Sequence, residues 1–411
     1  MIEKDFIILG IFIFTFSVLA LQKIPFLHLD RPSACLSGAV LMVAFGAISL
    51  DGAYNLIGWN TITLLLGMMI MSGSLRDGNF FKWLSFRVLS HSGNSSRLIW
   101  FLVFLSGILS AFFVNDTICI LMTPVILTMS EDGDIPAIPL LIALATSSNI
   151  GSVMTLVGNP QNMLIGIFSG ISFLKYFIIL APVAVFSLIA NSLLIKLVYK
   201  KEISKKKFEL QHLEEPAIDR FQVYSTLAIF GFVLVLFSLG FNLAFSAIAG
   251  AVMVMMIARK SPQHFFVFVD WSLLLLFCGL FVVVGTLKTT HWMEYLKITL
   301  TGENLFSDLL HFSGLTLIAS NIVSNVPFVV LMESIVKTLP HSELFWIALA
   351  MTSTFAGNFT LLGSVANIIV AETSKHKVKL SFFEFMKVGI TTTIVSTLIG
   401  IVWLWTVSEL I

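Results

Sequence analysis

Long apolar runs separated by short polar stretches dominate the chain and predict a series of membrane-spanning helices. A helix needs about 20 predominantly apolar residues to cross the hydrocarbon core of a bilayer. Eight uninterrupted runs are close to that length: 6–21, 32–50, 59–75, 173–199, 223–239, 241–257, 271–287 and 382–405. Further apolar regions share a different pattern, in which two apolar arms flank a polar centre.

The run 138–168 is the first of these interrupted regions. Its centre, 147–162, contains two glycines, one proline and three asparagines among several hydroxyl residues. A backbone group left unpaired in lipid costs several kcal/mol, so such a break is expected only inside protein or along a wet cavity. A helix broken at mid-membrane depth presents free N–H groups at one end and free C=O groups at the other. These ends bind anions and cations respectively.

The run 344–370 repeats this interrupted pattern at a constant offset of 205 positions. The matched residues are Ser148 and Ser353, Thr155 and Thr360, Gly158 and Gly363, and Asn162 and Asn367. Two interrupted apolar segments at corresponding places in two halves of a chain are the best sequence indicator of a transporter's binding site. We therefore expect the two breaks to meet.

Two further regions predict re-entrant hairpins that enter the membrane and return. In the first, arms at 96–114 and 117–129 flank Asn115 and Asp116, and each arm is short for a full crossing. In the second, 315–335, Ser324 and Asn325 stand at the centre, and Asn325 matches Asn115 at an offset of 210. Each pair of arms predicts a hairpin whose tip lies at mid-depth.

Together these patterns predict an all-α polytopic membrane protein built from two inverted repeats. Each repeat has five transmembrane helices, one of them broken, and one re-entrant hairpin. We place the N-terminal repeat at 1–199, a linker at 200–222 and the C-terminal repeat at 223–411, the two repeats forming one transporter domain. The composition agrees, because 57% of the residues are hydrophobic and 11% are charged, against about 25% charged in soluble domains.

The distribution of Lys and Arg predicts the orientation in the membrane. If the charged linker 200–222 is cytoplasmic, the inside loops hold seventeen Lys and Arg and the outside loops hold five. This asymmetry follows the positive-inside rule and places both termini outside an inner (plasma) membrane. Run 6–21 lacks a cleavage-site pattern, so we expect a retained helix. No basic patch is interleaved with aromatic residues, so nucleic acid is not an expected partner.

Asp116 is the one acidic residue far from the end of any predicted span. A carboxylate at the bilayer centre costs roughly 2.5–3.5 kcal/mol on insertion scales, so it should face the protein interior and marks function by default. It is expected to accept the coupling proton or to bind a cation. The alternative is a structural cap that binds N–H groups of the second hairpin arm. The matching position in the second half is Val326, so a coupling acid exists in one half only.

The remaining candidates are amides, hydroxyls and turn glycines at the breaks and tips. The predicted substrate- and ion-binding residues are Asn115, Asp116, Ser148, Asn149, Thr155, Gly158, Asn162, Ser324, Asn325, Ser353, Thr354, Asn358, Thr360, Gly363 and Asn367. Some of these side chains must instead pair with freed backbone groups, and the glycines are equally explained as tight turns. With no Lys or Arg expected near mid-depth, the set favours a small neutral or singly charged substrate. The three cysteines stand singly, which argues against a metal site.

These motifs resemble the ion transporter superfamily. The stretches that carry the resemblance are Val114–Thr117, Gly158–Asn162, Ser320–Pro327 and Thr360–Asn367. The superfamily includes arsenite/antimonite efflux permeases, a group of sodium/proton antiporters, and citrate/dicarboxylate carriers related to sodium symporters. The resemblance implies one central site, an elevator-like motion and often a homodimer. In dicarboxylate carriers, Ser, Asn and Thr signatures bind carboxylate and sodium; Ser148, Asn149 and Thr155 retain this set, whereas the second copy has Thr354 in place of the Asn.

The expected function is secondary active transport of a small ion, with proton-coupled efflux of arsenite or a similar oxyanion as the leading hypothesis. A sodium/proton antiporter, or a sodium-coupled dicarboxylate, citrate or sulfate symporter, is the alternative. No cofactor is expected beyond a coupling proton or sodium ion. The chain lacks Gly-x-Ser-x-Gly and His-Glu-x-x-His motifs, so we do not expect an enzyme.

Overall fold

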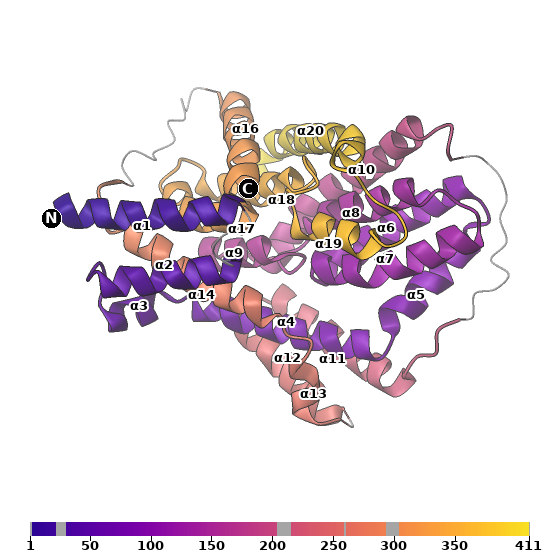
Figure 1. The fold of residues 1–411 in the computed structure, drawn as a ribbon, viewed down its shortest axis with the longest axis horizontal. Helices are drawn as coiled ribbons and strands as arrows, with labels where there is room; N and C mark the ends of the chain where they lie inside the picture. Colours follow the sequence, from indigo (N-terminus) through magenta and orange to yellow (C-terminus); the bar gives the residue numbers. More distant parts are fainter. Residues whose placement is uncertain (1, 22–29, 204–214, 259, 293–303, 411) are drawn as a thin grey trace.

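The structure, a computed structural model, describes residues 2–21, 30–203, 215–258, 260–292 and 304–410. Within these ranges every regular element is helical, as Figure 1 shows. The fold is therefore the all-α polytopic membrane fold that the sequence predicts, with hairpins and broken helices in both halves.

The helices of the two halves follow the same order. The first half contains α1 (Ile2–Leu21), α2 (Arg31–Ala44), α3 (Leu50–Leu56), α4 (Trp59–Asp77), α5 (Phe80–Leu89), α6 (Ser95–Phe112), α7 (Asn115–Asp132), α8 (Ala137–Ser152), α9 (Pro160–Ser169) and α10 (Phe173–Val198). The second contains α11 (Arg220–Ser238), α12 (Leu243–Ile257), α13 (Pro262–Phe266), α14 (Trp271–Leu287), α16 (Leu305–Val323), α17 (Asn325–Val336), α18 (Ser342–Ala356), α19 (Val365–Ser374) and α20 (Phe382–Thr406).

Both predicted interruptions and both predicted hairpins are present. The pair α6–α7, which we call hairpin 1, turns at 113–114, and α16–α17, hairpin 2, turns at Ser324. The helix α8–α9 is interrupted at 153–159, which we call break 1, and α18–α19 is interrupted at 357–364, break 2. Helix α9 begins with Pro160 at its first position, where a missing N–H is not needed.

The predicted span 32–50 is wrong at its C-terminal end. Helix α2 stops at Ala44, and the chain turns through Gly46, whose φ of +67° is accessible to glycine without strain. Ser49 then caps the separate short helix α3 with its side chain. Helix α3 meets α4 at a bend of 53°. The short helices α5 and α13 lie outside every predicted span.

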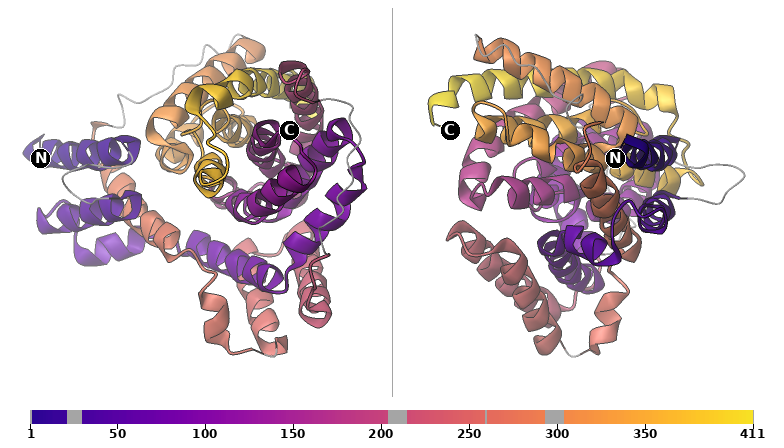
Figure 2. Two further views of the ribbon diagram at one scale, coloured as in Figure 1. Left: turned by 45° about the vertical axis from the view of Figure 1, so that its right-hand side comes forward. Right: turned by 90° about the vertical axis from the view of Figure 1, so that its left-hand side faces the viewer.

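Helices from the two halves interleave to form two groups. In the first, which we call the scaffold, α2 packs against α14 and α4 packs against α12, with α1 and α11 alongside. In the second, the core, α6 packs on α8, α16 on α18, α7 on α19, and α10 on α20. Figure 2 shows the core helices gathered together and the scaffold helices along one side. The hairpins and breaks all belong to the core.

Glycines allow the scaffold pairs to approach closely. A Cβ on Gly67 would lie 2.5 Å from the carbonyl carbon of Ala247, and a Cβ on Gly279 would lie 2.5 Å from that of Cys35. These two contacts are equivalent under the offset of 212 that relates α4 to α14 and α2 to α12. Because backbone cannot move aside as a side chain can, both positions require glycine.

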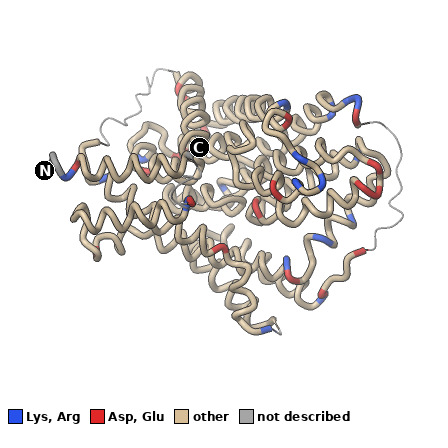
Figure 3. Tube along the Cα trace, in the orientation of Figure 1, with Lys and Arg blue, Asp and Glu red and all other residues tan. Residues whose placement is uncertain are grey.

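Polar contacts between distant segments sort the helix ends into two groups. At the end where α10 finishes and α11 starts, the pairs are Lys260–Asp77, Arg87–Glu215 (3.2 Å), Lys377–Glu131 (2.5 Å) and Tyr199–Glu384 (2.8 Å). At the other end they are Lys175–Glu343 (2.7 Å), Lys288–Glu333 (2.5 Å) and the Trp292 indole with the Asp5 carbonyl (3.1 Å). Each pair joins segments that the sequence places on one side of the membrane. Figure 3 shows charged residues gathered mainly at the first end.

By length and apolarity alone, five single helices could cross a membrane: α6, α10, α11, α16 and α20. The bent pair α3–α4 brings the total to six among the described residues. Of the other described helices, α1 has 20 residues and α14 covers its predicted span 271–287, whereas α2 and α12 are shorter than the runs predicted for them. The count of ten spans, the repeat boundaries and the cytoplasmic position of the linker stay predictions.

Candidate functional site

Breaks 1 and 2 meet at the centre of the core. The Asn149 amide, at the end of α8, donates to Asn358 Oδ1 at 2.8 Å and to Asn367 Oδ1 at 3.0 Å. From the other half, Thr354 Oγ1 at the end of α18 accepts from Asn159 Nδ2 at 3.2 Å and donates to Asn162 Oδ1 at 3.4 Å. Each half-helix therefore ends against the break of the opposite repeat.

These contacts are related by the internal repeat. Asn149 and Thr354 occupy matched positions, as do Asn162 and Asn367. Asn149 of the first repeat therefore binds Asn367 of the second, and Thr354 of the second binds Asn162 of the first. In both cases a residue near the end of one half-helix binds an asparagine in the first turn of the opposite repeat's second half-helix. The expectation that the two interruptions come together is confirmed at the level of individual hydrogen bonds.

Three of the predicted asparagines have their amide groups committed to the protein. Besides its two donated bonds, Asn149 Oδ1 accepts from Asn115 Nδ2 at 2.9 Å and from Ser364 Oγ at 3.1 Å. A side-chain amide offers two donors and two acceptor lone pairs, so Asn149 is saturated. Asn162 and Asn367 each donate to two carbonyls of their own break. These three residues hold the breaks together in this conformation.

The tip of hairpin 1 is sealed against break 1. The backbone N–H of Asn115 donates to the carbonyl of Gly158 at 3.1 Å. The Ser110 and Ser148 hydroxyls lie 2.8 Å apart, and Ser148 also donates to the Asn115 carbonyl at 3.2 Å. Thr155 donates to the carbonyl of Ala111. All residues of break 1 are buried, so this half of the site is closed.

Asp116 begins α7 beside this sealed tip and is half-buried. Its carboxylate makes no hydrogen bond to the residues that the structure describes, so the alternative of a cap bonded to the second arm is not what this structure shows. Arg31, at the start of α2, attracts the carboxylate electrostatically, and Asp270, which caps α14, repels it. The acid stands where the core meets the scaffold.

Hairpin 2 is less tightly joined to break 2. Ser320 donates within its own hairpin to Asn325 Oδ1 at 2.8 Å, and Ser353 points back to the Ala350 carbonyl of its own helix at 3.4 Å. Ser324, at φ +77°, makes the turn. Thr360 and Gly363 are partly exposed, and the adjacent Leu362 is 51% exposed. Break 2 is therefore less buried than break 1, and we call this half of the site open in that sense.

Several polar residues that the sequence analysis did not select also join the network. Asn358 donates to the Thr146 carbonyl at 3.0 Å, and the Thr146 hydroxyl accepts from Asn191 at 2.9 Å, which in turn accepts from Thr392 at 3.0 Å. All four are buried. The sequence feature that could have identified such residues is a polar side chain inside an otherwise apolar helix. Asn321 belongs to the same class and lies at hairpin 2.

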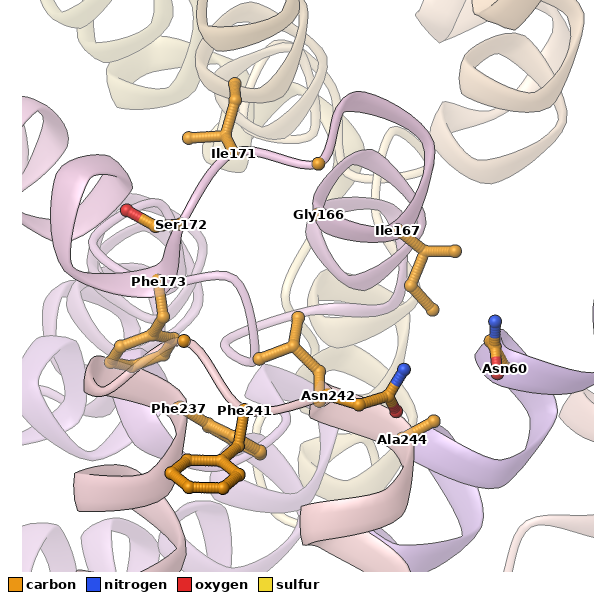
Figure 4. A pocket seen from close by; sticks show the side chains of 13 residues that line it. Asn60, Gly166, Ile167, Ile171, Ser172, Phe173, Phe237, Phe241, Asn242 and Ala244 are labelled. Carbon is orange, nitrogen blue, oxygen red and sulfur yellow. The ribbon is translucent and has the colours of Figure 1, made fainter.

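A cavity of about 270 Å³ separates core from scaffold at the end opposite the linker. It lies between the α9–α10 connection, with Gly170 and Ile171, and the α11–α12 connection, with Gly240 and Asn242. Figure 4 shows Asn60 and Asn242 on the scaffold side and Ser172 at the start of α10. None of the predicted site residues lines this cavity, so it is separate from the meeting point of the breaks.

Comparison with known proteins agrees with this architecture. The family model described as citrate transporter, CitMHS, matches residues 11–355. The chain belongs to the citrate transporter family. This places it within the ion transporter superfamily that its motifs resemble, and the family is one of membrane transporters.

Relatives within this family carry different names. The transporter named arsB of Dictyostelium discoideum is 27% identical over 96% of this chain and 90% of its own. The silicon efflux transporter LSI3 of Oryza sativa subsp. japonica is 29% identical over 92% of this chain and 93% of its own. Among solved structures, the YdaH transporter of Alcanivorax borkumensis, described as having an unusual topology, superposes with a TM-score of 0.60 at 12% identity, covering 99% of this chain and 98% of that one. That similarity concerns the fold alone.

Proposed function

We propose that the protein is a proton-coupled secondary transporter that extrudes arsenite or a similar small inorganic oxyanion. The observation that carries the proposal is Asp116, a half-buried carboxylate without a hydrogen-bond partner in the described structure, beside the amide network where the two breaks meet. A carboxylate in this setting can accept and release a proton as its surroundings change. The names of the relatives, arsB and the silicon efflux transporter LSI3, support a small inorganic substrate.

The division into core and scaffold supports an elevator-type movement. Hairpins, breaks and the central network all lie in the core, whereas α2, α4, α12 and α14 form interleaved pairs outside it. The open break 2 and closed break 1 are what one end state of alternating access requires, because substrate must reach the site from one side only. We propose that the core carries the site past the scaffold, which also brings Asp116 to the other side.

Sodium-coupled transport of citrate or another dicarboxylate is the second candidate, favoured by the family description and by retention of Ser148, Asn149 and Thr155. Against it, the amide of Asn149 is saturated by protein contacts. A carboxylate could bind there only if those bonds broke. A sodium/proton antiporter would use Asp116 without any oxyanion.

Everted membrane vesicles loaded with a pH-sensitive dye would distinguish these candidates. With an imposed proton gradient, arsenite uptake into the vesicles should occur against its own gradient, dissipate the proton gradient and stop when an uncoupler is added. Proton movement evoked by sodium alone would support the antiporter and reject our proposal. Sodium-dependent citrate uptake would support the symporter.

A further inference from the structure

The side chain of Asn321 lies one turn before the tip of hairpin 2, where its orientation is fixed by two hydrogen bonds. Its Nδ2 donates to the carbonyl of Leu317 at 2.9 Å and to that of Ala356 at 3.0 Å. Only the amino group of an amide can donate to a carbonyl. The opposite atom, Oδ1, must therefore point away from these two carbonyls.

Asn321 Oδ1 is a buried acceptor with no hydrogen-bond partner among the residues that the structure describes. An acceptor removed from water without a partner destabilises the fold, and native structures contain few such atoms. The atom faces break 2, because it lies 2.9 Å from the point that a Cβ on Gly363 would occupy. The Gly357 carbonyl lies 2.9 Å from the same point. A side chain at 363 would collide with this acceptor, so glycine at that position leaves room for it.

The first repeat has no equivalent group. Its matching residue is Ala111, and the backbone carbonyl of Ala111 accepts from Thr155. The matching Thr360 of the second repeat is partly exposed and makes no such bond in the described structure. Repeat 2 therefore has one acceptor more than repeat 1, placed at the break that is open. The difference is encoded by a single exchange of alanine for asparagine.

We propose that Asn321 is a substrate-binding residue whose Oδ1 accepts a hydrogen bond from a hydroxyl group of the transported species. This rests on the proposed function and narrows it. A carbonyl oxygen attracts a hydrogen-bond donor and repels an anion. Asn321 therefore selects the undissociated acid, which carries hydroxyl groups, over its deprotonated anion. Arsenite near neutral pH is mainly such an undissociated acid with three hydroxyl groups, whereas a citrate-like polyanion offers few donors.

A purely structural role for Asn321 predicts a different outcome. Its two donated bonds hold hairpin 2 to the end of α18, so their loss would lower stability without changing affinity. The Asn321→Ala variant removes both the donors and the acceptor. Asn304→Ala is the matched control, because Asn304 caps the same helix at its far end through two hydrogen bonds, to Phe306 N and Ser307 N.

Arsenite transport by the full-length protein in everted vesicles gives the first test. We expect Asn321→Ala to raise the KM for arsenite about tenfold, as loss of one well-made hydrogen bond to substrate would, with little change in maximal rate. Asn321→Ser, which keeps an acceptor, should recover part of the affinity. Asn304→Ala should lower the thermal midpoint while the KM stays unchanged. An unchanged KM in Asn321→Ala would make the residue structural and overturn the proposal.

Failure of the wild-type protein to move arsenite would reject the proposed function, and a ligand-independent measurement then tests Asn321 by itself. Asn321→Cys, in a background carrying Cys278→Ser, is treated with a membrane-impermeant methanethiosulfonate from each side. We expect reaction from one side only, and none at Ala111→Cys in the sealed repeat. If Asn321→Cys does not react from either side, the side chain does not face an aqueous site and the inference fails.

Discussion

The two hairpin-and-break units are built from matched residues, yet they are joined differently. In the first, hydroxyl pairs link hairpin to broken helix: Ser106 with Ser147 at 2.6 Å and Ser110 with Ser148 at 2.8 Å. In the second, the residues matching Ser106 and Ser147 are Thr316 and Thr352, whose buried hydroxyls have no partners in the described structure. The hydroxyl links that close the first unit are therefore absent from the second.

The sequence explains part of this difference. A Cβ on Gly151 would lie 2.0 Å from the carbonyl oxygen of Gly107, so α6 and α8 are in direct backbone contact. The matching residues in the second unit are Ala356 and Leu317, whose side chains do not allow the same backbone contact between α16 and α18. This unequal packing favours the closed form of the first unit over that of the second.

The largest effect on stability is expected from substituting Gly151, the residue at the backbone contact between α6 and α8. Gly151→Ala places a side chain against immobile backbone, and overpacking of this kind costs about 3 kcal/mol. We expect a large drop in thermal midpoint and loss of transport. The converse change Ala356→Gly should cost only about 1 kcal/mol, from helix propensity. Equal effects of the two variants, measured by thermal shift of purified protein, would show that the contact does not distinguish the units.

The second-largest effect is expected at Asp116, because the first unit has this acid and the second unit has Val326 at the matching position. Asp116→Asn should abolish proton-coupled arsenite accumulation in everted vesicles because the amide cannot carry the proton. Stability should change by about 1 kcal/mol or less, since no hydrogen bond of the described structure is lost. The exposed Asp51→Asn is the control and should transport normally. Coupling that survives in Asp116→Asn would assign the proton to another group.

The hydroxyl pairs allow a direct test of closure. A double-mutant cycle with Ser110→Ala and Ser148→Ala should give a coupling free energy of about 1 kcal/mol, as expected for a buried hydrogen bond. The matched cycle at Ser320 and Ser353 should give a value near zero. Thermal or denaturant unfolding in detergent provides both measurements. Similar coupling in the two cycles would indicate that the second unit also closes in solution.

The smallest effect is expected at the ion pair between the scaffold and hairpin 2. Lys288, which directly follows α14, lies 2.5 Å from Glu333 of α17, with side chains 23% and 21% exposed. Partly exposed pairs contribute about 0.5 kcal/mol, so Lys288→Gln, which leaves the pair of Glu333 with Lys337 in place, should raise the labelling rate of Val326→Cys about twofold by loosening the second hairpin. Lys375→Gln, which removes a pair within one turn of the core, should leave the rate unchanged.

Some of the site could be read from residue order and some could not. Ser, Thr, Gly and Asn at matched positions of two apolar runs identified both breaks. Polar residues between the arms of two further apolar regions identified both hairpin tips, because lipid excludes such residues unless protein covers them. The same reasoning did not reveal that Asn149 is saturated, nor that Asn321 has a spare acceptor. Hydrogen-bond capacity depends on neighbours that are distant in sequence. Arg31 lies just before the predicted span 32–50, and only packing brings it within electrostatic range of Asp116.

By itself the sequence determined the membrane environment, the internal repeat, the interruptions and the lone acid, because each follows from local chemistry and from spacing along one chain. The tertiary structure alone decided which residues of opposite halves touch and which unit stands open. These properties depend on backbone approach, such as that of Gly107 to Gly151, and on the competition of several polar groups for the same partners. Neither the backbone approach nor the choice of hydrogen-bond partner can be deduced from the order of residues alone.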